Sequence, residues 1–431
     1  MKKTVIKIID LLNLHNHNSK KYPFLLESVT QNNTDKSYSI LFAFPKDEIV
    51  LNNLEDFDFL TVLKNNILKE PKKSNIPFSG GWFVYLSYEC AAQIEPVLLN
   101  TIPLGDKVKA YAVRIPSAVI IDHSNNQSYI IDEDDNDNRI NEILNDISSI
   151  QEVNEIDIKV HITEEDPNKF INMIKKCKNY IVEGDIFQAN ISRWWQVELD
   201  NNITCQHIYK KLRSTNPAPF SALADYKGFQ IISSSPERLF NVKGRYIQTR
   251  PIAGTHPRGV GDKDKELINR LLHHHKEQAE HIMLVDLERN DLGRVCEFGS
   301  VKADEIMFLE TYSYVHHIVS NIIGKLKKDC NIKDIIAAIF PGGTITGCPK
   351  IRSIEIISEL EKTPRYFYTG SLGYISNNGN MDFNILIRSF MKEKNKVMFR
   401  TGAGIVFDSV AGRELKETYH KAEGLLKAFT F

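Results

Sequence analysis

Strand-like and helix-like segments follow one another along this chain of 431 residues without strict alternation. Runs rich in β-branched and aromatic residues, which are typical of strands, include YSILFAFP, GGWFVYLSYE and SAVIIDH, and later FQIISSS, YSYVHHIVSNIIG, FYTGSLGYIS and NKVMFRTGAGIVF. A doubly wound parallel sheet requires strands and helices to alternate regularly, so this order argues against one. We therefore predict an α+β fold in which large antiparallel sheets are flanked by helices.

One helix can be placed together with both of its ends. Asp166 is a typical N-cap, Pro167 suits the first helical position, and Gly184 fits just beyond the last turn. Between them, apolar residues recur at spacings of three and four, namely Phe170, Met173, Ile174, Cys177 and Ile181. A strand-like run, IFQANISRWWQVEL, follows at once, and further helices are predicted over residues 264–285, 332–339, 350–361 and 411–428.

The balance of charge excludes one class of partner. The chain has 54 Lys and Arg against 55 Asp and Glu, so the formal net charge is 54 − 55 = −1. It lacks the excess of positive charge with which proteins bind nucleic acid. No run approaches the roughly 18 apolar residues that cross a bilayer. The six cysteines are scattered without a C-x-x-C pair, as in reduced cytosolic proteins. We expect a cytoplasmic protein that binds neither nucleic acid nor membrane.

The segment from Ile131 to Asp157 shows the clearest shift in composition. It contains a short acidic run, Asp132, Glu133, Asp134, Asp135 and Asp137, which indicates a solvated connection. We place a boundary there, between an N-terminal subdomain over residues 1–155 and a second domain over residues 160–431.

Two pairs of glutamates are spaced three residues apart on predicted helices. Glu277 and Glu280 form one pair, and Glu414 and Glu417 form the other near the C-terminus. Residues i and i+3 share a helix face, so each pair directs two carboxylates the same way. Two such faces opposed to each other would form an oxygen cage suited to Mg²⁺. The simpler alternative is two exposed acidic faces, because Glu pairs are common on helices.

Two glycine-rich loops adjoin predicted strands. FPGGTITGCPK leads into a helix, and RTGAGIVFDS follows a strand. Glycines let the backbone approach a ligand and direct N–H groups at an anion. The first loop lacks G-x-x-x-x-G-K-[ST], which argues against a mononucleotide site. A carboxylate-binding backbone nest and an ordinary tight turn both fit each loop.

Single reactive side chains offer further candidates. His316 and His317 adjoin in a strand-like run, so their rings should point to opposite faces. Arg388 lies in the apolar run MDFNILIRSFM, and a charge buried there requires an anionic partner, either a ligand or an internal salt bridge. Elements of the G-x-S-x-G and G-x-C-x-G kind are absent, which argues against a nucleophilic hydrolase or an internal glutaminase.

Ordered motifs in the second part of the chain resemble the chorismate-utilising enzymes, the family of anthranilate synthase and aminodeoxychorismate synthase large subunits. In chain order they are GDIFQANISR, SSSPERLF, RPIAGTHPRG, EHIMLVDLERNDLGRV, SYVHHIVSNIIG, PGGTITGCPKIRSIEIISELE, YTGSLGYI, MDFNILIRS, TGAGIVFDS and ELKETYHKA. The resemblance implies an anthranilate-synthase-type fold, in which two large, mostly antiparallel sheets pack as a sandwich with flanking helices.

The resemblance also implies a role for individual residues. Glu280 and Glu417 match the principal magnesium ligands, and Glu277 and Glu414 match supporting positions. His317 matches a catalytic residue tied to proton movement. Contacts with chorismate are implied for Thr255, Thr344, Tyr368, Arg388, Lys421 and the backbone of Gly402, Ala403 and Gly404. In the N-terminal part, Leu25 to Ser28 matches an L-L-E-S element through which relatives bind tryptophan, which implies a tryptophan pocket at Leu26, Glu27 and Ser28.

The same resemblance implies amination of chorismate with ammonia. Isochorismate and salicylate synthases activate water with a Lys at the position of Gln188, and Gln cannot serve as that base. At the position of Ala253, many aminodeoxychorismate synthases carry a catalytic Lys, whereas anthranilate synthases carry Ala. Against this, QANIS, PFLLESV and GGWFVYLSYECAAQIEP favour an aminodeoxychorismate synthase, a transferase of p-aminobenzoate and folate synthesis. The alternatives are an anthranilate synthase, a lyase that yields anthranilate and pyruvate, and an inactive chorismate-binding homologue. The missing glutaminase implies a separate glutamine amidotransferase subunit as ammonia donor.

Overall fold

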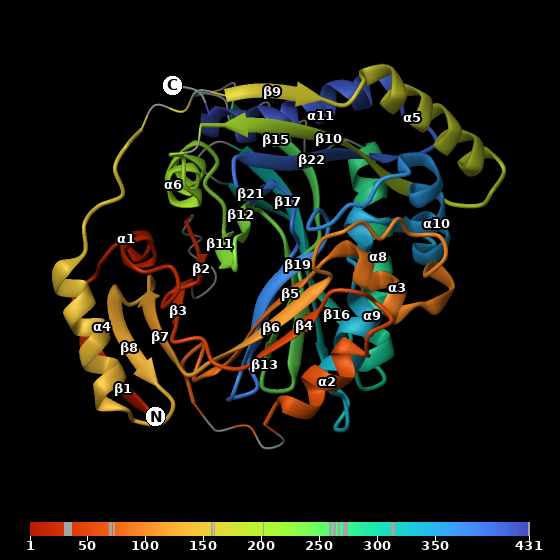
Figure 1. The fold of residues 1–431 in the computed structure, drawn as a ribbon. Helices are drawn as coiled ribbons and strands as arrows, with labels where there is room; N and C mark the ends of the chain where they lie inside the picture. The colour runs from red at the N-terminus through yellow and green to blue at the C-terminus, as the bar shows by residue number, and fades with distance from the viewer. Residues whose placement is uncertain are drawn as a thin grey trace.

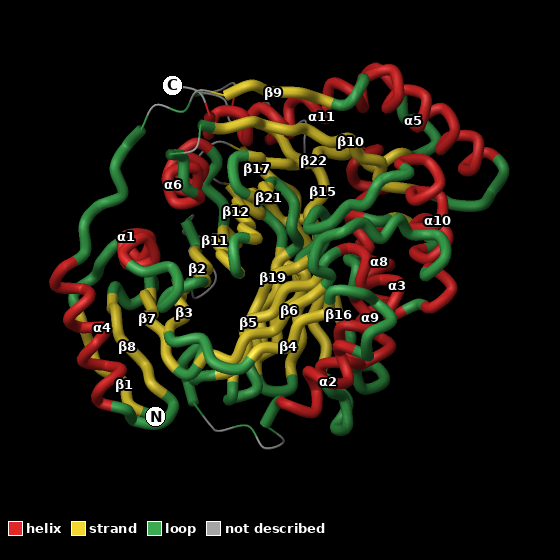
Figure 2. The backbone as a smooth tube through the Cα atoms, viewed as in Figure 1, coloured by secondary structure: helices red, strands yellow, loops and turns green. Residues whose placement is uncertain are grey.

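The computed structural model describes residues 1–29, 37–68, 71, 74–156, 158, 160–200, 202–257, 261, 264–265, 268–269, 275–311 and 315–429. Strands within these ranges form two sheets, and every pairing in them is antiparallel. Helices cover the outer faces (Figures 1 and 2).

The larger sheet has the strand order β1-β8-β7-β3-β2-β11-β12-β21-β22-β10-β18, and β9 also pairs with β10. In chain order its strands are β1 (Lys2–Ile6), β2 (Phe24–Glu27), β3 (Tyr38–Ala43), β7 (Ser117–Asp122), β8 (Gln127–Asp132), β9 (Val160–Glu164), β10 (Gln188–Leu199), β11 (Phe220–Tyr226), β12 (Phe229–Ser235), β18 (Gly347–Cys348), β21 (Ser389–Glu393) and β22 (Lys396–Ile405).

The smaller sheet has the order β15-β17-β14-β13-β20-β19-β5-β6-β4, and β16 also pairs with β17. Its strands are β4 (Glu48–Leu51), β5 (Gly81–Leu86), β6 (Ala110–Ile115), β13 (Arg238–Lys243), β14 (Tyr246–Thr249), β15 (Ile252–Pro257), β16 (Lys302–Thr311), β17 (Val315–Lys325), β19 (Ser371–Ser376) and β20 (Met381–Asn384).

The described helices lie outside these sheets. They are α1 (Leu11–His17), α2 (Phe59–Asn66), α3 (Ala91–Ile94), α4 (Asp137–Ser149), α5 (Pro167–Val182), α6 (Cys205–Thr215), α8 (His275–Val295), α9 (Ile332–Ile339), α10 (Lys350–Glu361) and α11 (Ala411–Leu426), with 3₁₀ turns η1 (Tyr88–Cys90), η2 (Pro96–Leu98), η3 (Gly343–Ile345) and η4 (Lys427–Phe429). In Figure 1, α2, α8 and α9 lie beside the smaller sheet, and α5 and α11 lie beside β10 and β22.

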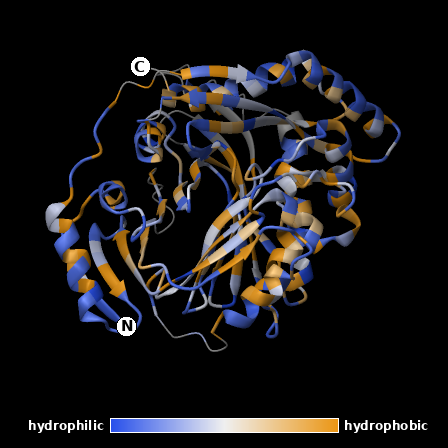
Figure 3. Ribbon diagram, in the orientation of Figure 1, coloured by the Kyte–Doolittle hydropathy of each residue, from blue (hydrophilic) through white to orange (hydrophobic). Residues whose placement is uncertain are grey.

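The two sheets pack face to face through an aromatic core. The rings of Phe24 on β2 and Phe83 on β5 stack with centroids 4.0 Å apart, and Phe42 on β3 meets Phe83 edge-on at 5.4 Å. Figure 3 shows hydrophobic residues along the strands between the sheets. Burying aromatic rings removes a large apolar area from water, which is the main force holding such layers together. The predicted α+β sandwich is confirmed.

Local sequence signals explain several helix ends. Asp166 Oδ1 accepts a hydrogen bond of 2.9 Å from the Asn168 N–H and caps α5, whose first residue is Pro167. Gly184 follows the helix with φ of 85°, a conformation that glycine adopts without strain. The predicted helices over 332–339 and 350–361 match α9 and α10 residue for residue. Residues 266–267 and 270–274 of the predicted helix 264–285 lie outside the described residues, and α8 continues to Val295.

The expectation of a solvated connection is right only in part: Asp134, Asp135 and Asp137 are exposed, but the segment also contains the end of β8 and the helix α4. Asp132 ends β8, is buried, and accepts hydrogen bonds from Ser117 and Arg139. Asn136 then caps α4, which buries Ile140 and Ile143 against the sheet. Charge density alone misled the prediction, because the apolar residues between the charges have helical spacing.

Each sheet contains strands from both sides of residue 155. β2 pairs with β11 in the larger sheet, and β5 pairs with β19 in the smaller. The division of the chain between residues 155 and 160 therefore stays a prediction, and it does not separate one sheet from the other. Among the described helices, none combines the length and apolar character needed to cross a membrane.

Candidate active site

Strands β10 and β22 form the floor of the candidate active site. Asn190 pairs with Gly404 and Ser192 with Gly402, and paired residues point to the same face of a sheet. A Cβ atom on Gly402 would lie 2.8 Å from the Tyr368 hydroxyl oxygen, so glycine here leaves bare backbone beside that tyrosine. The opposite face packs into the core beneath α5 and α10 through Ala189, Ile191, Ala403 and Ile405. The predicted contact at Ala403 could therefore involve its backbone only.

Among the described strands, none pairs with one edge of β22 where it passes the site. β21 pairs with β22 only as far as Met398, whereas β10 continues beside it to Ile405. On this stretch the Gly402 carbonyl accepts a hydrogen bond of 2.9 Å from Lys421 Nζ. Lys421 also forms an ion pair of 2.6 Å with Glu417, one turn earlier on α11. Lys421 thus connects a predicted metal ligand to the glycine strand.

Glu280 reaches the same floor from α8. Gln188 Nε2, at the start of β10, lies 3.4 Å from Glu280 Oε1, and a Cβ atom on Gly404 would lie 3.5 Å from that oxygen. Gln188 is buried, and its Oε1 has no hydrogen-bond partner among the described residues. Buried amide oxygens are normally paired. This one is therefore available to a donor group on a ligand.

The acidic side chains at the floor have the chemistry of magnesium ligands. Glu414 is buried and Glu417 is half-buried, one turn apart on α11. Burial would raise the pKa of Glu417, but Lys421 outweighs it and lowers that pKa. Together with Glu280 these groups supply the hard oxygen donors that Mg²⁺ prefers. Among the described residues, no three acidic, His or Cys side chains are yet close enough to enclose an ion.

Arg388 and Tyr368 lie beside Lys421. The Arg388 guanidinium donates to the Lys421 carbonyl, 2.9 Å away, and forms no salt bridge with an acidic residue in the described part of the structure. Burial lowers the pKa of Arg388, and the nearby Tyr368 and Glu417 offset this only in part. A half-buried cation of this kind favours an anionic ligand. Burial also raises the pKa of Tyr368 to about 12, so its hydroxyl remains a neutral donor.

Sequence analysis assigned no role to Glu237, a buried carboxyl group on this side of the site. Its Oε1 accepts a hydrogen bond of 2.7 Å from Thr344 Oγ1, a predicted substrate contact on η3. Burial raises the pKa of Glu237 to about 7, although Thr344 and Lys421 act to lower it. A carboxyl group that keeps its proton near neutral pH can act as an acid. The signal was present in SSSPERLF, where one acidic residue separates two strand-like runs.

A buried ionic cluster supports the floor from below. Glu361, at the end of α10, accepts hydrogen bonds from Arg365 at 2.6 Å and Arg400 at 2.9 Å. Arg365 also donates to the Asn190 carbonyl at 2.6 Å, and its guanidinium lies 5.5 Å from the centroid of the Tyr368 ring. The cluster therefore fixes β10, β22 and Tyr368 relative to one another.

Four predicted residues have side chains outside the described part of the structure: Ala253, Thr255, Glu277 and His317. Their elements are described. Thr255 pairs with His317 across β15 and β17, and Glu277 lies on α8 with Glu280. His316 is buried and forms hydrogen bonds of 2.9 Å with Thr311 and Asp264.

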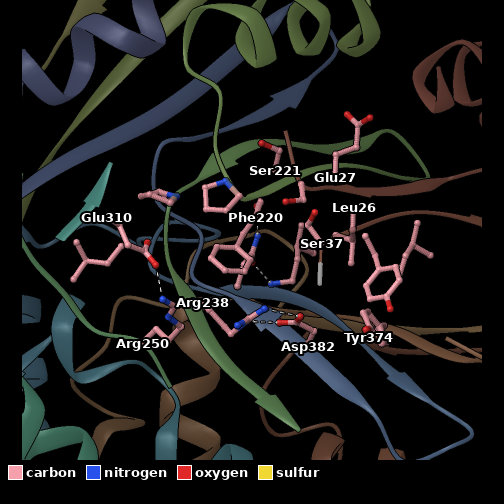
Figure 4. Close-up of a pocket in the computed structure, with 18 of the residues that line it drawn as sticks. Leu26, Glu27, Ser37, Phe220, Ser221, Arg238, Arg250, Glu310, Tyr374 and Asp382 are labelled. Carbon is pink, nitrogen blue, oxygen red and sulfur yellow. Dashed lines mark hydrogen bonds and ion pairs between the residues drawn. The ribbon is translucent and has the colours of Figure 1, made fainter. Parts of the chain in front are cut away.

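A second pocket lies where the N-terminal strands meet the smaller sheet (Figure 4). Its volume is about 130 Å³, and its lining includes all three residues of the predicted tryptophan pocket, Leu26, Glu27 and Ser28. Glu27 accepts a hydrogen bond of 2.7 Å from the Tyr209 hydroxyl, and burial raises its pKa.

Two ion pairs lie on the wall of this pocket, and one of them is next to β15. Arg238 contacts Asp382 at 3.0 Å, and Arg250 contacts Glu310. Arg250 lies just before β15, the strand that carries Ala253 and Thr255. A ligand in the pocket would therefore contact the base of that strand.

Comparison with known proteins identifies the family. The model of the family described as chorismate binding enzyme matches residues 22–427. This chain belongs to the chorismate binding enzyme family, as the motifs predicted, and is a chorismate-utilising enzyme by family.

Similar proteins divide between two activities. An anthranilate synthase component I-like protein of Synechocystis is 41% identical over 82% of this chain and 73% of that protein. Aminodeoxychorismate synthase component 1 of Bacillus subtilis is 40% identical over 81% of this chain and 77% of that one. The crystal structure of anthranilate synthase component I from Streptococcus pneumoniae superposes with a TM-score of 0.80 at 31% identity, covering 92% of this chain and 93% of that chain.

Proposed function

We propose that this protein is the chorismate-aminating component of an aminodeoxychorismate synthase. Gln188 supports amination, because its buried amide oxygen has no described partner at the floor of the site. Anthranilate synthases and aminodeoxychorismate synthases both carry Gln at this position, so the choice between the two products rests on QANIS, PFLLESV and GGWFVYLSYECAAQIEP, which favour an aminodeoxychorismate synthase. Ammonia has three N–H groups and needs such acceptors, whereas an amide cannot deprotonate water. The relative from Bacillus subtilis, named for this activity, supports the assignment.

The charges around the floor suit a substrate with two carboxylates. Arg388 and the backbone of Gly402–Gly404 would hold the enolpyruvyl carboxylate. Lys421 would add positive charge between this carboxylate and Glu417. Glu280 and Glu417, with Glu277 and Glu414, would hold Mg²⁺. When bound, Mg²⁺ would neutralise the ring carboxylate and make it an electron sink. These contacts fix the ring in one orientation over Gln188.

Glu237 would supply the proton that the leaving group needs. The nitrogen of ammonia forms a bond to the ring as the bond from the ring to the hydroxyl oxygen breaks. The hydroxyl takes the Glu237 proton and leaves as water, and the amine nitrogen then returns one proton to Glu237. The reaction therefore consumes chorismate and ammonia and releases the amino compound and water. The pKa of Glu237, raised to about 7 by burial, is suited to this exchange.

Anthranilate synthase is the second candidate. Ala253 favours it, because anthranilate synthases carry Ala at this motif position. His317, on the strand paired with Thr255, matches the residue tied to loss of the pyruvyl group. The Synechocystis and Streptococcus relatives named above carry that label.

Ammonia would come from a glutamine amidotransferase subunit in the cytoplasm. The sequence lacks the G-x-C-x-G element of a glutaminase nucleophile, so glutamine should be inert with this chain alone. Free ammonium should support turnover without a partner. The product would then serve p-aminobenzoate and folate synthesis.

The deciding experiment is a product assay with purified protein, chorismate, Mg²⁺ and ammonium at alkaline pH. Aliquots are separated by HPLC with and without added aminodeoxychorismate lyase. We expect p-aminobenzoate only when the lyase is present. Anthranilate and pyruvate without lyase would instead identify an anthranilate synthase, and no consumption of chorismate would identify an inactive homologue.

An Ala253→Lys variant tests the position of the motif residue. If position 253 faces the substrate ring, the new amine should form a covalent adduct with chorismate, visible as added mass in intact-protein mass spectrometry. The unchanged protein, treated in the same way, is the control. An unmodified variant that still turns over chorismate would place residue 253 away from the ring.

We propose tryptophan as the ligand of the second pocket. Its lining combines the apolar Leu26, Phe220 and Tyr374 with the acidic Glu27 and two arginines, which suits an amphipathic amino acid. Calorimetric titration with tryptophan should give saturable binding that Ser28→Tyr, which fills the pocket, removes. Titration of the wild type without heat exchange would contradict the proposal, and the effect on turnover would show whether binding regulates the enzyme.

A further inference from the structure

Asn190 is a residue of the floor to which neither the sequence analysis nor the proposed mechanism gives a role. It lies on β10 two residues after Gln188, so both side chains point to the same face of the sheet. Its Oδ1 is buried and has no hydrogen-bond partner among the described residues, and the same is true of Gln188 Oε1. Buried amide oxygens are normally paired, so two unpaired ones on one face indicate acceptors for a ligand.

The backbone of Asn190 is held in place by other residues. Its N–H donates to the Thr346 carbonyl at 2.8 Å, and its carbonyl accepts a hydrogen bond of 2.6 Å from Arg365. Arg365 belongs to the buried ionic cluster around Glu361. Both backbone groups of Asn190 are therefore engaged, and its side-chain oxygen is left for a ligand.

Asn190 faces Tyr368 across Gly402 of β22. A Cβ atom on Gly402 would lie 2.7 Å from Asn190 Oδ1 and 2.8 Å from the Tyr368 hydroxyl oxygen. The two oxygens thus lie around one point, yet no hydrogen bond joins them in the described part of the structure. Lys421 Nζ donates to the Gly402 carbonyl, and Arg388 donates to the Lys421 carbonyl. This end of the floor therefore lies beside the cation proposed to hold the enolpyruvyl carboxylate.

Gln188 lies at the other end of the floor, over Gly404. A Cβ atom on Gly404 would lie 2.5 Å from Gln188 Nε2 and 3.5 Å from Glu280 Oε1. Glu280 is a proposed magnesium ligand, so this end would receive the ring carboxylate. Successive residues on one face of a strand lie about 7 Å apart, so Gln188 and Asn190 reach different ends of a bound ring.

These two ends correspond to two ring positions of chorismate. The hydroxyl is on the ring carbon opposite the carbon that carries the ring carboxylate, and next to the carbon that carries the enolpyruvyl ether. With the ring carboxylate at Glu280 and the enolpyruvyl carboxylate at Arg388, the hydroxyl-bearing carbon lies toward Asn190. The carbon adjacent to the ring carboxylate lies toward Gln188. Amination at the first carbon gives aminodeoxychorismate, and amination at the second gives the precursor of anthranilate.

We propose that Asn190 sets the position of amination, because its Oδ1 accepts a hydrogen bond from ammonia beside the hydroxyl-bearing carbon. The inference rests on the proposed function and names the residue that separates its two candidate products. Ammonia bound through its N–H groups directs its lone pair at the ring, so the place where it is bound decides which carbon it attacks. Asn190 contacts the reacting nitrogen in this arrangement and is therefore a catalytic residue.

The amide oxygen changes the place of the reaction and leaves its balance unchanged. At either carbon the ammonia nitrogen bonds to the ring, and the bond from the ring to the hydroxyl oxygen breaks with its electron pair on that oxygen. Attack at the adjacent carbon also moves each of the two ring double bonds by one position. The oxygen takes a proton from Glu237 and departs as water, and the new amine returns one proton to Glu237. Asn190 neither gains nor loses a proton.

The direct test is product analysis of Asn190→Leu, which keeps a similar shape without an acceptor oxygen. Wild type and variant are given chorismate, Mg²⁺ and ammonium, and HPLC with and without aminodeoxychorismate lyase separates the products. We expect the ratio of lyase-dependent p-aminobenzoate to anthranilate and its amino precursor to fall about tenfold in the variant, the effect of one lost hydrogen bond in the transition state. An unchanged ratio would overturn the proposal.

Steady-state constants give a second readout, which a general loss of structure would not reproduce. In Asn190→Leu, KM for ammonium should rise by about 3- to 10-fold. KM for chorismate should stay within about twofold of the wild type, because both carboxylates keep their proposed partners. A rise confined to KM for chorismate would show that Asn190 acts on the ring instead of on ammonia, and would overturn the proposal.

Asn190→Asp is the conservative variant. It keeps an acceptor oxygen at the same place, so the product ratio should stay that of the wild type. Its negative charge should raise KM for chorismate, which is a dianion. A ratio as low as that of Asn190→Leu would contradict the proposal. If Asn190→Leu does not fold, Asn190→Ala replaces it, and a wild-type ratio in Asn190→Ala would again overturn the proposal.

Asn377 supplies the matched control. It is 6% exposed, directly follows β19 at the end remote from Tyr368, and donates through Nδ2 to Glu133 at 2.6 Å. Asn377→Leu also removes a buried amide, but it should leave the product ratio and both KM values unchanged. A change equal to that of Asn190→Leu would attribute the effect to lost stability and would overturn the proposal.

The wild type separates a failure of this inference from a failure of the proposed function. Anthranilate, or no product, from the wild type would overturn both. Lyase-dependent p-aminobenzoate from the wild type, together with the same product ratio from Asn190→Leu, would overturn the inference alone.

Discussion

Glu361 and Glu288 are both buried helical glutamates, with exposed fractions of 1% and 8%, yet their surroundings are opposite. Glu361 accepts hydrogen bonds from two arginines, Arg365 and Arg400. Burial would raise its pKa, but the arginines outweigh burial and lower it. Glu288 has no hydrogen bond from an arginine among the described residues, and burial raises its pKa to about 8. Burial therefore does not decide whether a carboxyl group keeps its proton; the charge of its neighbours does.

The difference separates a structural acid from one available for chemistry. The Glu361 cluster is complete within the protein and holds two strands together. Glu237 and Glu288 have no such counter-charge bonded to them among the described residues, and burial raises the pKa of each. The following predictions test this contrast, from the largest effect to the smallest.

Removing Glu361 should have the largest effect on stability. Glu361→Ala leaves Arg365 and Arg400 buried without their counter-charge, which should lower the free energy of unfolding by about 3–5 kcal/mol. Urea unfolding at pH 7 measures it. Glu359→Ala, an exposed position on the same helix, is the control. A loss no larger than that of the control would show that the cluster is not structural.

Glu280→Gln and Glu417→Gln should affect activity without affecting the fold. Each removes an ionised oxygen from the proposed magnesium site, so we expect kcat/KM to fall by about 100- to 1,000-fold. Circular dichroism and urea unfolding should match the wild type. Full activity in either variant would contradict the assignment of that residue as a ligand.

The stability of Glu288→Gln should depend on pH with a predictable sign. Burial raises the pKa of Glu288 in the folded state from its ordinary value of 4.5 to about 8, so between pH 4.5 and pH 8 the unfolded chain binds fewer protons than the folded one. The wild type should therefore lose stability relative to the variant as pH rises from 4.5 to 8, by about 2–4 kcal/mol in total.

The difference in stability between the wild type and Glu361→Gln should change with pH in the opposite direction. Its folded-state pKa is lowered, so its stabilising contribution is present at neutral pH and is lost as the protein is acidified. Urea unfolding at several pH values compares both variants with the wild type. Parallel curves for Glu288→Gln and the wild type would contradict the raised pKa.

Thr344→Val should produce the smallest shift. The Thr344 hydroxyl hydrogen bonds to Glu237 and lowers its pKa, so its loss should raise that pKa by up to about one unit. Infrared titration of the substrate-free protein measures this. Thr346→Val is the control, because that hydroxyl donates to the Gly342 carbonyl. A pKa that falls instead would show that the hydroxyl does not stabilise the ionised form.

The parts of the fold that the sequence predicted well are those set by local signals. Asp166, Pro167 and Gly184 mark the ends of α5 correctly, because capping depends on residues within one turn. The acidic run around Asp132 was misjudged, because its buried hydrogen bonds come from Arg139 and Ser117, which adjoin it only after folding.

The site shows the same limit. The motifs indicated Glu280, Arg388 and Lys421, and the structure brings their elements to one floor. The raised pKa values of Glu237 and Glu288 could not be recognised from sequence. Their properties arise from packing of β13, η3 and α8, which are distant in the chain, and no local pattern reports the polarity of a folded interior.

The pairing of β10 with β22 has a consequence for the order of folding. Ala189 pairs with Ile405, so the floor joins two strands made far apart in time during synthesis. Contacts between distant segments form late, because a long loop must close first. A nascent chain that ends before β22 has no glycine edge, and α11 with Glu417 comes later still. The capacity to bind chorismate therefore arises only after α11 has left the ribosome.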